Sequence, residues 1–214
     1  MKVMCLADSE KSPKLVEATL PEPQPGSGEV LIRISAAGVT PTELSWYPTT
    51  HDQSGALRTG AVPSHEFSGT IAAVGSGVRD FALGQSIFGM NDWFSQGALA
   101  EFCVAQATSI APAPLTLTPI QAASVPIGAL TAWQGLFEHG HLEAGQTVLI
   151  HGGSGGVGHF AIQFAKVGGA TVWTTVSAQN LDFVRPGPGP RRGRNPGTVL
   201  VGIEAEWHPR LGAR

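Results

Sequence analysis

Short apolar runs separated by turn-forming residues fill the first 119 residues of the chain. No helical period longer than two turns interrupts them, so this part predicts an antiparallel barrel or sandwich. The connections are rich in glycine and proline, as at residues 21–28 and 75–77, where glycine adopts a positive φ at little cost. The strands are expected at residues 3–7, 15–20, 30–35, 67–74, 85–88 and 98–105.

After residue 117 the pattern changes to helices that alternate with strands. Thr118 can cap a helix that has Pro119 in its first turn and continues through residue 123. Both strands expected in this part are apolar throughout, so the order strand, helix, strand predicts a parallel sheet covered on both faces. The remaining elements are a helix at 127–138, a strand at 146–151, a helix at 157–167 and a strand at 170–176.

Composition and charge exclude several classes of function. Of the 214 residues only 14% are charged, and the net charge of −3 gives no electrostatic reason to bind nucleic acid or an anionic membrane. Two cysteines, Cys5 and Cys103, cannot make a disulfide framework, which suits a cytoplasmic protein. No run of about 18 apolar residues predicts a membrane span. The apolar run at residues 3–7 is too short for the core of a signal peptide.

The sharpest motif is a glycine-rich stretch between an expected strand and an expected helix. Gly153, Gly155 and Gly158 satisfy the pattern G-x-G-x-x-G. Gly153 is expected to permit the tight turn, Gly155 to let the backbone approach a pyrophosphate and Gly158 to allow close helix packing. The motif predicts dinucleotide binding at the helix N-terminus, against the alternative of a flexible glycine turn. The loop residues expected to bind the cofactor are Gly153, Ser154, Gly155, Gly156, Val157 and Gly158.

An absence of acidic residues bears on which cofactor is bound. NAD sites usually place Asp or Glu about 20 residues after the glycines, but this chain has no acid between Glu143 and Asp182. Ser177 and Asn180 follow the second strand, so a 2′-phosphate would meet hydroxyl and amide donors. NADP(H) is therefore favoured over NAD, with Ser177 and Asn180 as candidate binding residues. In the alternative interpretation, these polar residues cap the next helix.

Several ordered stretches resemble the medium-chain dehydrogenase/reductases, in the zinc-independent quinone oxidoreductase branch. They are residues 36–41 (AAGVTP), 62–69 (VPSHEFSG), 71–75 (IAAVG), 129–133 (ALTAW) and the glycine loop. The resemblance implies a GroES-like antiparallel β-barrel domain at 1–119 and an incomplete Rossmann NADP-binding domain at 120–184 in an α/β protein. It also implies hydride transfer to a small-molecule quinone or α,β-unsaturated carbonyl (enone), and it is compatible with a homodimer.

The same resemblance bears on zinc. Zinc-dependent relatives have a cysteine at the position of Thr40, a His-Glu pair that matches His65 and Glu66, and a later cysteine near Gly128. A catalytic zinc needs three protein ligands and at most two remain, so no metal is expected. His65 and Glu66 are interpreted as a structural hydrogen-bonded pair.

Without zinc, hydrogen bonds must polarise the substrate carbonyl. The resemblance implies that Thr40 meets the nicotinamide ribose and that Thr131 approaches the nicotinamide. Tyr47, the only tyrosine, is a candidate donor of a hydrogen bond or proton. In the alternative interpretation, residues 45–48 form an apolar loop that closes the barrel.

The last thirty residues, 185–214, differ in composition from the rest. They contain 6 Arg, 5 Pro and 6 Gly, whereas the first 184 residues contain only 3 Arg. The resemblance ends at Arg185, which favours a reading-frame shift there, with an authentic disordered tail as the alternative. A sheet cut short in this way would leave residues 172–176 as an exposed apolar edge. The chain is then either an NADPH-dependent reductase or a catalytically inactive fragment that keeps a nucleotide- or partner-binding fold.

Overall fold

The computed structural model describes residues 1–7, 14–40, 42–184, 191–195 and 198–203, and every structural statement below concerns these residues. The chain divides into two compact units, Met1–Pro126 and Ile127–Arg214. In the described part of the chain, no helix is long and apolar enough to span a membrane.

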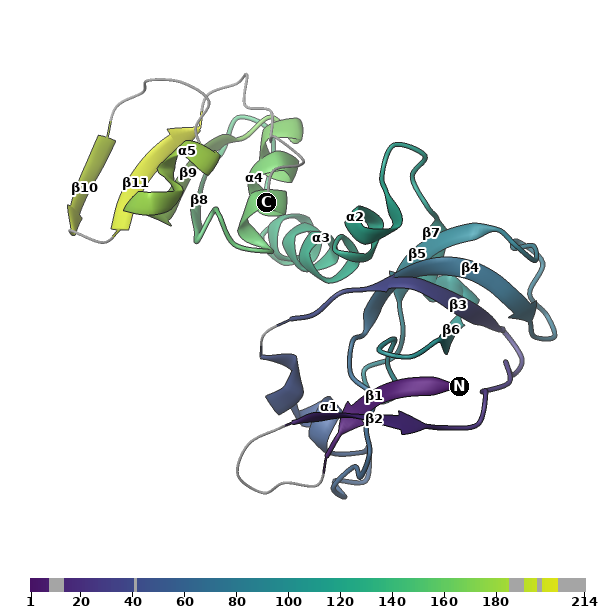
Figure 1. The fold of residues 1–214 in the computed structure, drawn as a ribbon. Helices are drawn as coiled ribbons and strands as arrows, with labels where there is room; N and C mark the ends of the chain where they lie inside the picture. Colours follow the sequence, from purple (N-terminus) through teal and green to yellow (C-terminus); the bar gives the residue numbers. More distant parts are fainter. Residues whose placement is uncertain (8–13, 41, 185–190, 196–197, 204–214) are drawn as a thin grey trace. The chain divides into compact units, whose positions relative to one another are not determined.

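The first unit is built from antiparallel strands (Figure 1). A two-stranded sheet joins β1 (Lys2–Leu6) to β2 (Leu15–Thr19), and a five-stranded sheet has the order β6-β3-β4-β5-β7. Its strands are β3 (Glu29–Ala37), β4 (Glu66–Val74), β5 (Ser86–Met90), β6 (Phe102–Gln106) and β7 (Ile110–Pro112). The helical segments are η1 (Glu43–Ser45), α1 (Tyr47–Thr50), η2 (Ala107–Ser109) and α2 (Pro119–Ala123).

Alternating burial along the strands builds the core of this unit. β6 turns Cys103 and Ala105 inward, and they pack with large side chains of β3, β4 and β5. The pleat places every second side chain on one face, so this alternation fixes the register of each strand. The buried set is Val30, Ile32, Phe67, Ile71, Ile87, Ala98, Cys103, Ala105 and Ile110.

The second unit has a mixed four-stranded sheet of order β10-β11-β9-β8. The strands are β8 (Thr147–His151), β9 (Thr171–Ser177), β10 (Arg191–Asn195) and β11 (Thr198–Ile203). β8 and β9 are parallel, whereas β11 lies antiparallel to β9. The helices are α3 (Pro126–Trp133), which continues as a π-helical segment over Gln134–His139, α4 (Gly158–Val167), η4 (Ala178–Asn180) and α5 (Leu181–Val184).

Most of the expected elements are present, with ends that differ by a few residues. The parallel strand-helix-strand unit is confirmed. Thr118 caps α2 as predicted, and it forms a reciprocal capping box with Gln121. The strand expected at 98–105 begins only at Phe102. Residues before it pair with β1 instead, through the Val3–Ala100 bridge.

Two expectations about the sheet of the second unit are wrong. Residues 172–176 are not an open edge, because β11 pairs with β9 along its length. The sheet is also not covered on both faces, since β8 buries Ile150 but leaves Leu149 53% exposed. The sequence predicts a tail at residues 185–214 that is disordered or aberrant. The tail in the structure differs from this expectation in part, because residues 191–195 and 198–203 form strands. Its other residues, 185–190, 196–197 and 204–214, lie outside the described part of the chain.

Candidate functional site: the glycine loop of the second unit

The glycine loop leaves the end of β8 and enters α4 through a left-handed turn. Gly152 has φ +70°, a conformation that favours glycine. Gly153 has another role, since a Cβ there would overlap the hydroxyl of Thr174 and lie 2.8 Å from Ile162 Cδ1. The turn thus depends on Gly152, whereas the sequence assigned it to Gly153. Gly153 permits close packing of the loop on β9.

Hydrogen bonds to β9 hold the start of the loop in place. The Gly153 N–H donates to the Thr175 carbonyl at 3.0 Å, and the Gly152 N–H donates to Thr175 Oγ1 at 3.2 Å. His151 Nδ1 lies 3.1 Å from the same hydroxyl. In the buried layer beneath, Thr174 Oγ1 donates to the Ile150 carbonyl at 2.7 Å. β9 therefore fixes the backbone from which the loop departs.

The loop presents a group of backbone amides without partners. In the described part of the chain, the N–H groups of Ser154, Gly156, Val157 and Gly158 have no hydrogen-bond acceptor. Val157 is the N-cap of the ten-residue helix α4, and its side chain cannot cap the helix. Free N–H groups and the positive end of the helix dipole together favour an anion such as a phosphate. Residues 155–157 are exposed, so a ligand can reach them.

Two further glycines let backbone segments pack closely around this loop. A Cβ at Gly158 would overlap the Gly152 carbonyl oxygen, as expected for a glycine that permits close helix packing. A Cβ at Gly128, in α3, would lie 2.5 Å from the Gly156 carbonyl oxygen and 3.1 Å from the ring of Phe160. Sequence reasoning missed Gly128 as a supporting residue of the loop. The available signal was a glycine inside a helix, where it is otherwise unfavourable.

Asn180 is brought to the glycine loop by the turn after β9. Its Nδ2 donates to Ser154 Oγ at 3.1 Å. Ser177 is the N-cap of η4 but makes no side-chain capping bond. Ser177 therefore occupies the N-cap position that the alternative interpretation expects, but its side chain does not cap the helix. Thr131 is exposed on α3.

The other candidate residues belong to the first unit. Thr40 is partly buried, and its carbonyl accepts the Glu43 N–H at 2.9 Å. Tyr47 begins α1 and stacks on His51, with ring centroids 4.5 Å apart. Its side chain is 56% exposed, which does not fit the alternative of an apolar loop that closes the barrel.

The expected pairing of His65 with Glu66 is wrong. His65 is completely buried, and its Nδ1 lies 3.0 Å from Asn91 Oδ1. Since an amide oxygen only accepts, Nδ1 carries the proton, and the bond from Asn91 Nδ2 to the Gln96 carbonyl supports this amide orientation. Within the described part of the chain, His65 Nε2 has no hydrogen-bond partner, and it lies 3.8 Å from Glu43 Oε1.

Burial shifts the titration of this pair toward the neutral forms. Burial lowers the pKa of His65, although the hydrogen bond with Asn91 raises it. Burial also raises the pKa of Glu43, although backbone N–H groups, chiefly that of Ser64, oppose this effect. Among the described residues, no three His, Cys, Asp or Glu side chains gather as a metal site. Independence from zinc stays a prediction.

Comparisons with known proteins agree with this arrangement. The family model for the alcohol dehydrogenase GroES-like domain matches residues 26–115. A chloroplastic quinone-oxidoreductase homolog of Spinacia oleracea is 33% identical over 183 residues, which cover 80% of this chain and 53% of the relative.

Solved structures give the same picture. An alcohol dehydrogenase superfamily protein from Novosphingobium aromaticivorans is 34% identical, with a TM-score of 0.77 over 86% of this chain and 56% of that one. The quinone oxidoreductase from Coxiella burnetii is 31% identical, with a TM-score of 0.71 over 86% and 59% of the two chains. The chain thus spans little more than half the length of these proteins.

Proposed function

Because the chain belongs to the medium-chain dehydrogenase/reductase superfamily, with a GroES-like domain followed by a partial α/β region, we propose that its glycine loop binds NADP(H). The observation that carries this proposal is the set of four unpartnered N–H groups at the uncapped start of α4. Residues 155–157 of this loop are exposed, and they follow a strand, β8, that is paired with β9. A flexible turn would not need the close packing that Gly153 and Gly158 provide.

In this proposal each part of the cofactor has its own binding residues. The N–H groups of Ser154, Gly156, Val157 and Gly158 would donate hydrogen bonds to the pyrophosphate, and Gly155 would leave room for its approach. Ser177 and Asn180 meet the 2′-phosphate. Asn180 is already held near the loop by its bond to Ser154. An acid at this place would repel the 2′-phosphate.

The proposed reaction is the zinc-independent reduction of a quinone or an α,β-unsaturated carbonyl. When bound, the reduced nicotinamide supplies the hydride. Thr40 and Thr131 are proposed to position the nicotinamide and its ribose. Tyr47 is the proposed donor to the substrate carbonyl, and the residue is 56% exposed. Homodimer formation and a cytoplasmic location belong to the same proposal.

A second candidate is a catalytically inactive chain that still binds the nucleotide. The observation that favours it is length, since the chain spans only 53% of the Spinacia oleracea relative. β11, which lies antiparallel to β9, comes from the part of the chain where the resemblance has ended.

One experiment tests binding and activity in sequence. The full 214-residue chain is titrated with NADPH and with NADH while the fluorescence of the reduced nicotinamide is recorded. The proposal expects saturable binding with NADPH bound more tightly, and oxidation of NADPH after a quinone is added. Binding without oxidation supports the inactive chain. No binding of either nucleotide at millimolar concentration refutes both candidates.

A further inference from the structure

The outer edge of β6 in the first unit carries backbone groups that no neighbouring strand uses. In the described part of the chain, β6 is the terminal strand of its sheet and pairs only with β3. The Ile34 N–H donates to the Glu101 carbonyl and the Ala107 N–H to the Gly28 carbonyl. In an antiparallel ladder, bonded and non-bonded pairs alternate. The backbone N–H and C=O groups of Cys103 and Ala105 therefore form hydrogen bonds with β3. Those of Phe102, Val104 and Gln106 point away from β3.

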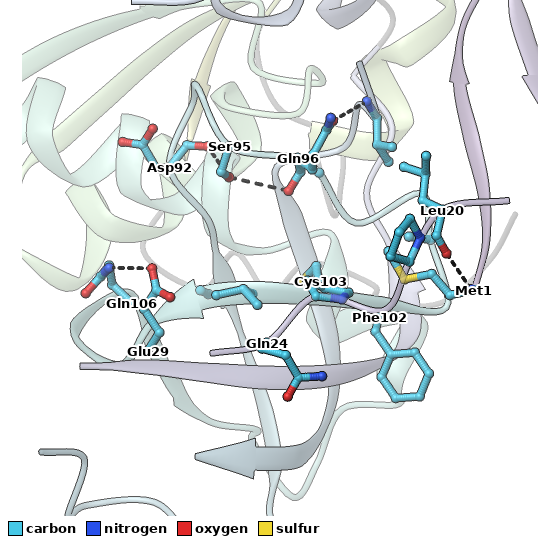
Figure 2. Close-up of a pocket in the computed structure, with 17 residues that line it drawn as sticks. Met1, Leu20, Gln24, Glu29, Asp92, Ser95, Gln96, Phe102, Cys103 and Gln106 are labelled. Atoms are coloured by element: carbon cyan, nitrogen blue, oxygen red, sulfur yellow. Dashed lines mark hydrogen bonds between the residues drawn. The ribbon is translucent and has the colours of Figure 1, made fainter. Parts of the chain in front are cut away.

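These outward groups have no hydrogen-bond partner in the described part of the chain. They open into a groove with a volume of about 390 Å³ that follows β6 from Phe102 to Gln106 (Figure 2). Every residue of β6 lines this groove, together with Leu20, Pro21, Pro23 and Gln24 on another segment. Such a volume falls in the range of ligand-binding sites. Its lining strand offers backbone donors and acceptors at regular spacing.

The chain segment at residues 20–25 cannot complete the β6 ladder. Prolines at positions 21, 23 and 25 have no N–H, and each keeps the residue before it extended. The Leu20 N–H donates to the Met1 carbonyl, which ties the start of this segment to the β1 strand end. The segment is therefore a stiff wall without donors at alternate positions. It leaves the edge of β6 unpaired instead of closing over it.

The charged side chains of the groove are acidic. Among the residues that the structure describes, Glu29 and Asp92 line it and no Lys or Arg does. Glu29 accepts hydrogen bonds from the Gly26 N–H at 2.7 Å and from Gln106 Nε2 at 3.0 Å, so its carboxylate is held near the end of β6. Asp92 Oδ1 accepts the Phe94 N–H at 2.8 Å. The two carboxylates favour a basic side chain on a ligand of the groove.

We propose that the groove binds an extended peptide segment of a partner protein, which pairs with β6 as an added strand and places a Lys or Arg near Glu29 and Asp92. The peptide backbone would form hydrogen bonds with the outward N–H and C=O groups of Phe102, Val104 and Gln106, as in other cases of strand addition. A second folded copy at this edge is the other possible occupant, and the test below distinguishes it from a peptide.

The test uses a fluorescein-labelled peptide, acetyl-Lys-Val-Thr-Val-Thr-Val-Lys-amide, and the full chain. Fluorescence anisotropy is expected to show saturable binding. Methylation of alternate peptide nitrogens removes donors without changing the protein, and it should weaken binding at least about tenfold, since a hydrogen bond contributes about that factor. Replacing both peptide lysines by glutamate should weaken binding further.

A matched pair of protein variants identifies the edge. Val104→Pro removes an outward N–H but no bond to β3, a position where an edge strand tolerates proline. It is expected to weaken peptide binding about tenfold, whereas Val104→Ala, which keeps the N–H, should weaken it clearly less. Circular dichroism and thermal melting check that both variants fold.

Three results would overturn the inference. The first is the absence of saturation at millimolar peptide, and the second is equal binding of the methylated peptide. The third is concentration-dependent self-association in sedimentation that Val104→Pro abolishes, because a second copy would then occupy the edge. None of these results depends on nucleotide binding, which the NADPH titration measures separately.

Discussion

Replacing Val157 by proline removes one of the four N–H groups proposed to hold the cofactor phosphates. Val157 is the helix N-cap with φ −92°, moderately outside the range that proline prefers, and its own N–H has no partner in the described structure. The folded chain therefore loses no hydrogen bond. A hydrogen bond to a charged group contributes about 1.5–3 kcal/mol, so the Kd for NADPH should rise roughly 10- to 150-fold.

Val157→Ala is the matched control, because it shortens the side chain and keeps the N–H. The side chain is 39% exposed, so its loss should change stability and binding little. Fluorescence titration gives both dissociation constants, and thermal melting reports the fold. The reasoning is refuted if a folded Val157→Pro binds NADPH as tightly as the unaltered chain. It is also refuted if alanine and proline weaken binding equally, since the side chain would then be responsible.

Three further predictions concern packing, cofactor choice and pH. Gly128→Ala should lower the stability of the second unit by about 1–3 kcal/mol in denaturant unfolding, because its Cβ would press on the Gly156 carbonyl; unchanged stability would contradict that contact. Asn180→Asp should shift the preference from NADPH toward NADH about tenfold or more, measured as the ratio of Kd values, whereas Asn180→Ala should not favour NADH. Folding lowers the pKa of His65, so below about pH 6.5 this histidine binds more protons in the unfolded chain than in the folded one. The free energy of unfolding should therefore fall as the pH drops from 7 to 5, by at most about 1.4 kcal/mol per pH unit from this group. The raised pKa of Glu43 changes stability with pH in the opposite direction. The contribution of His65 is therefore measured as a difference between the unaltered chain and His65→Leu in the slope of unfolding free energy against pH. Equal slopes for the two proteins would contradict the prediction.

The elements around the glycine loop could be predicted because their signals are local. An apolar strand, closely spaced glycines and an amphipathic helix follow one another within residues 146–167. Thr118 and Gln121 are likewise three positions apart, which is the spacing of a capping box. Local sequence thus fixed which segments are helices and strands, and where the loop lies between them.

Features that depend on contacts distant in sequence could not be predicted. Asn91, the partner of His65, is 26 positions away, and nothing near His65 indicates it. β11, at 198–203, lies within a segment rich in arginine, proline and glycine. That composition indicates disorder, so the pairing of β11 with β9 could not be predicted from it. The left-handed turn at Gly152 was missed because the motif directs attention to the next glycine.

The proposed cofactor site depends on phosphate groups that accept hydrogen bonds from the loop amides. Nuclear magnetic resonance spectra of ¹⁵N-labelled chain during an NADPH titration test this most directly. The amide signals of Ser154, Gly156, Val157 and Gly158 should shift together and saturate with the Kd found by fluorescence. Saturable binding that leaves these four signals unmoved would contradict the account.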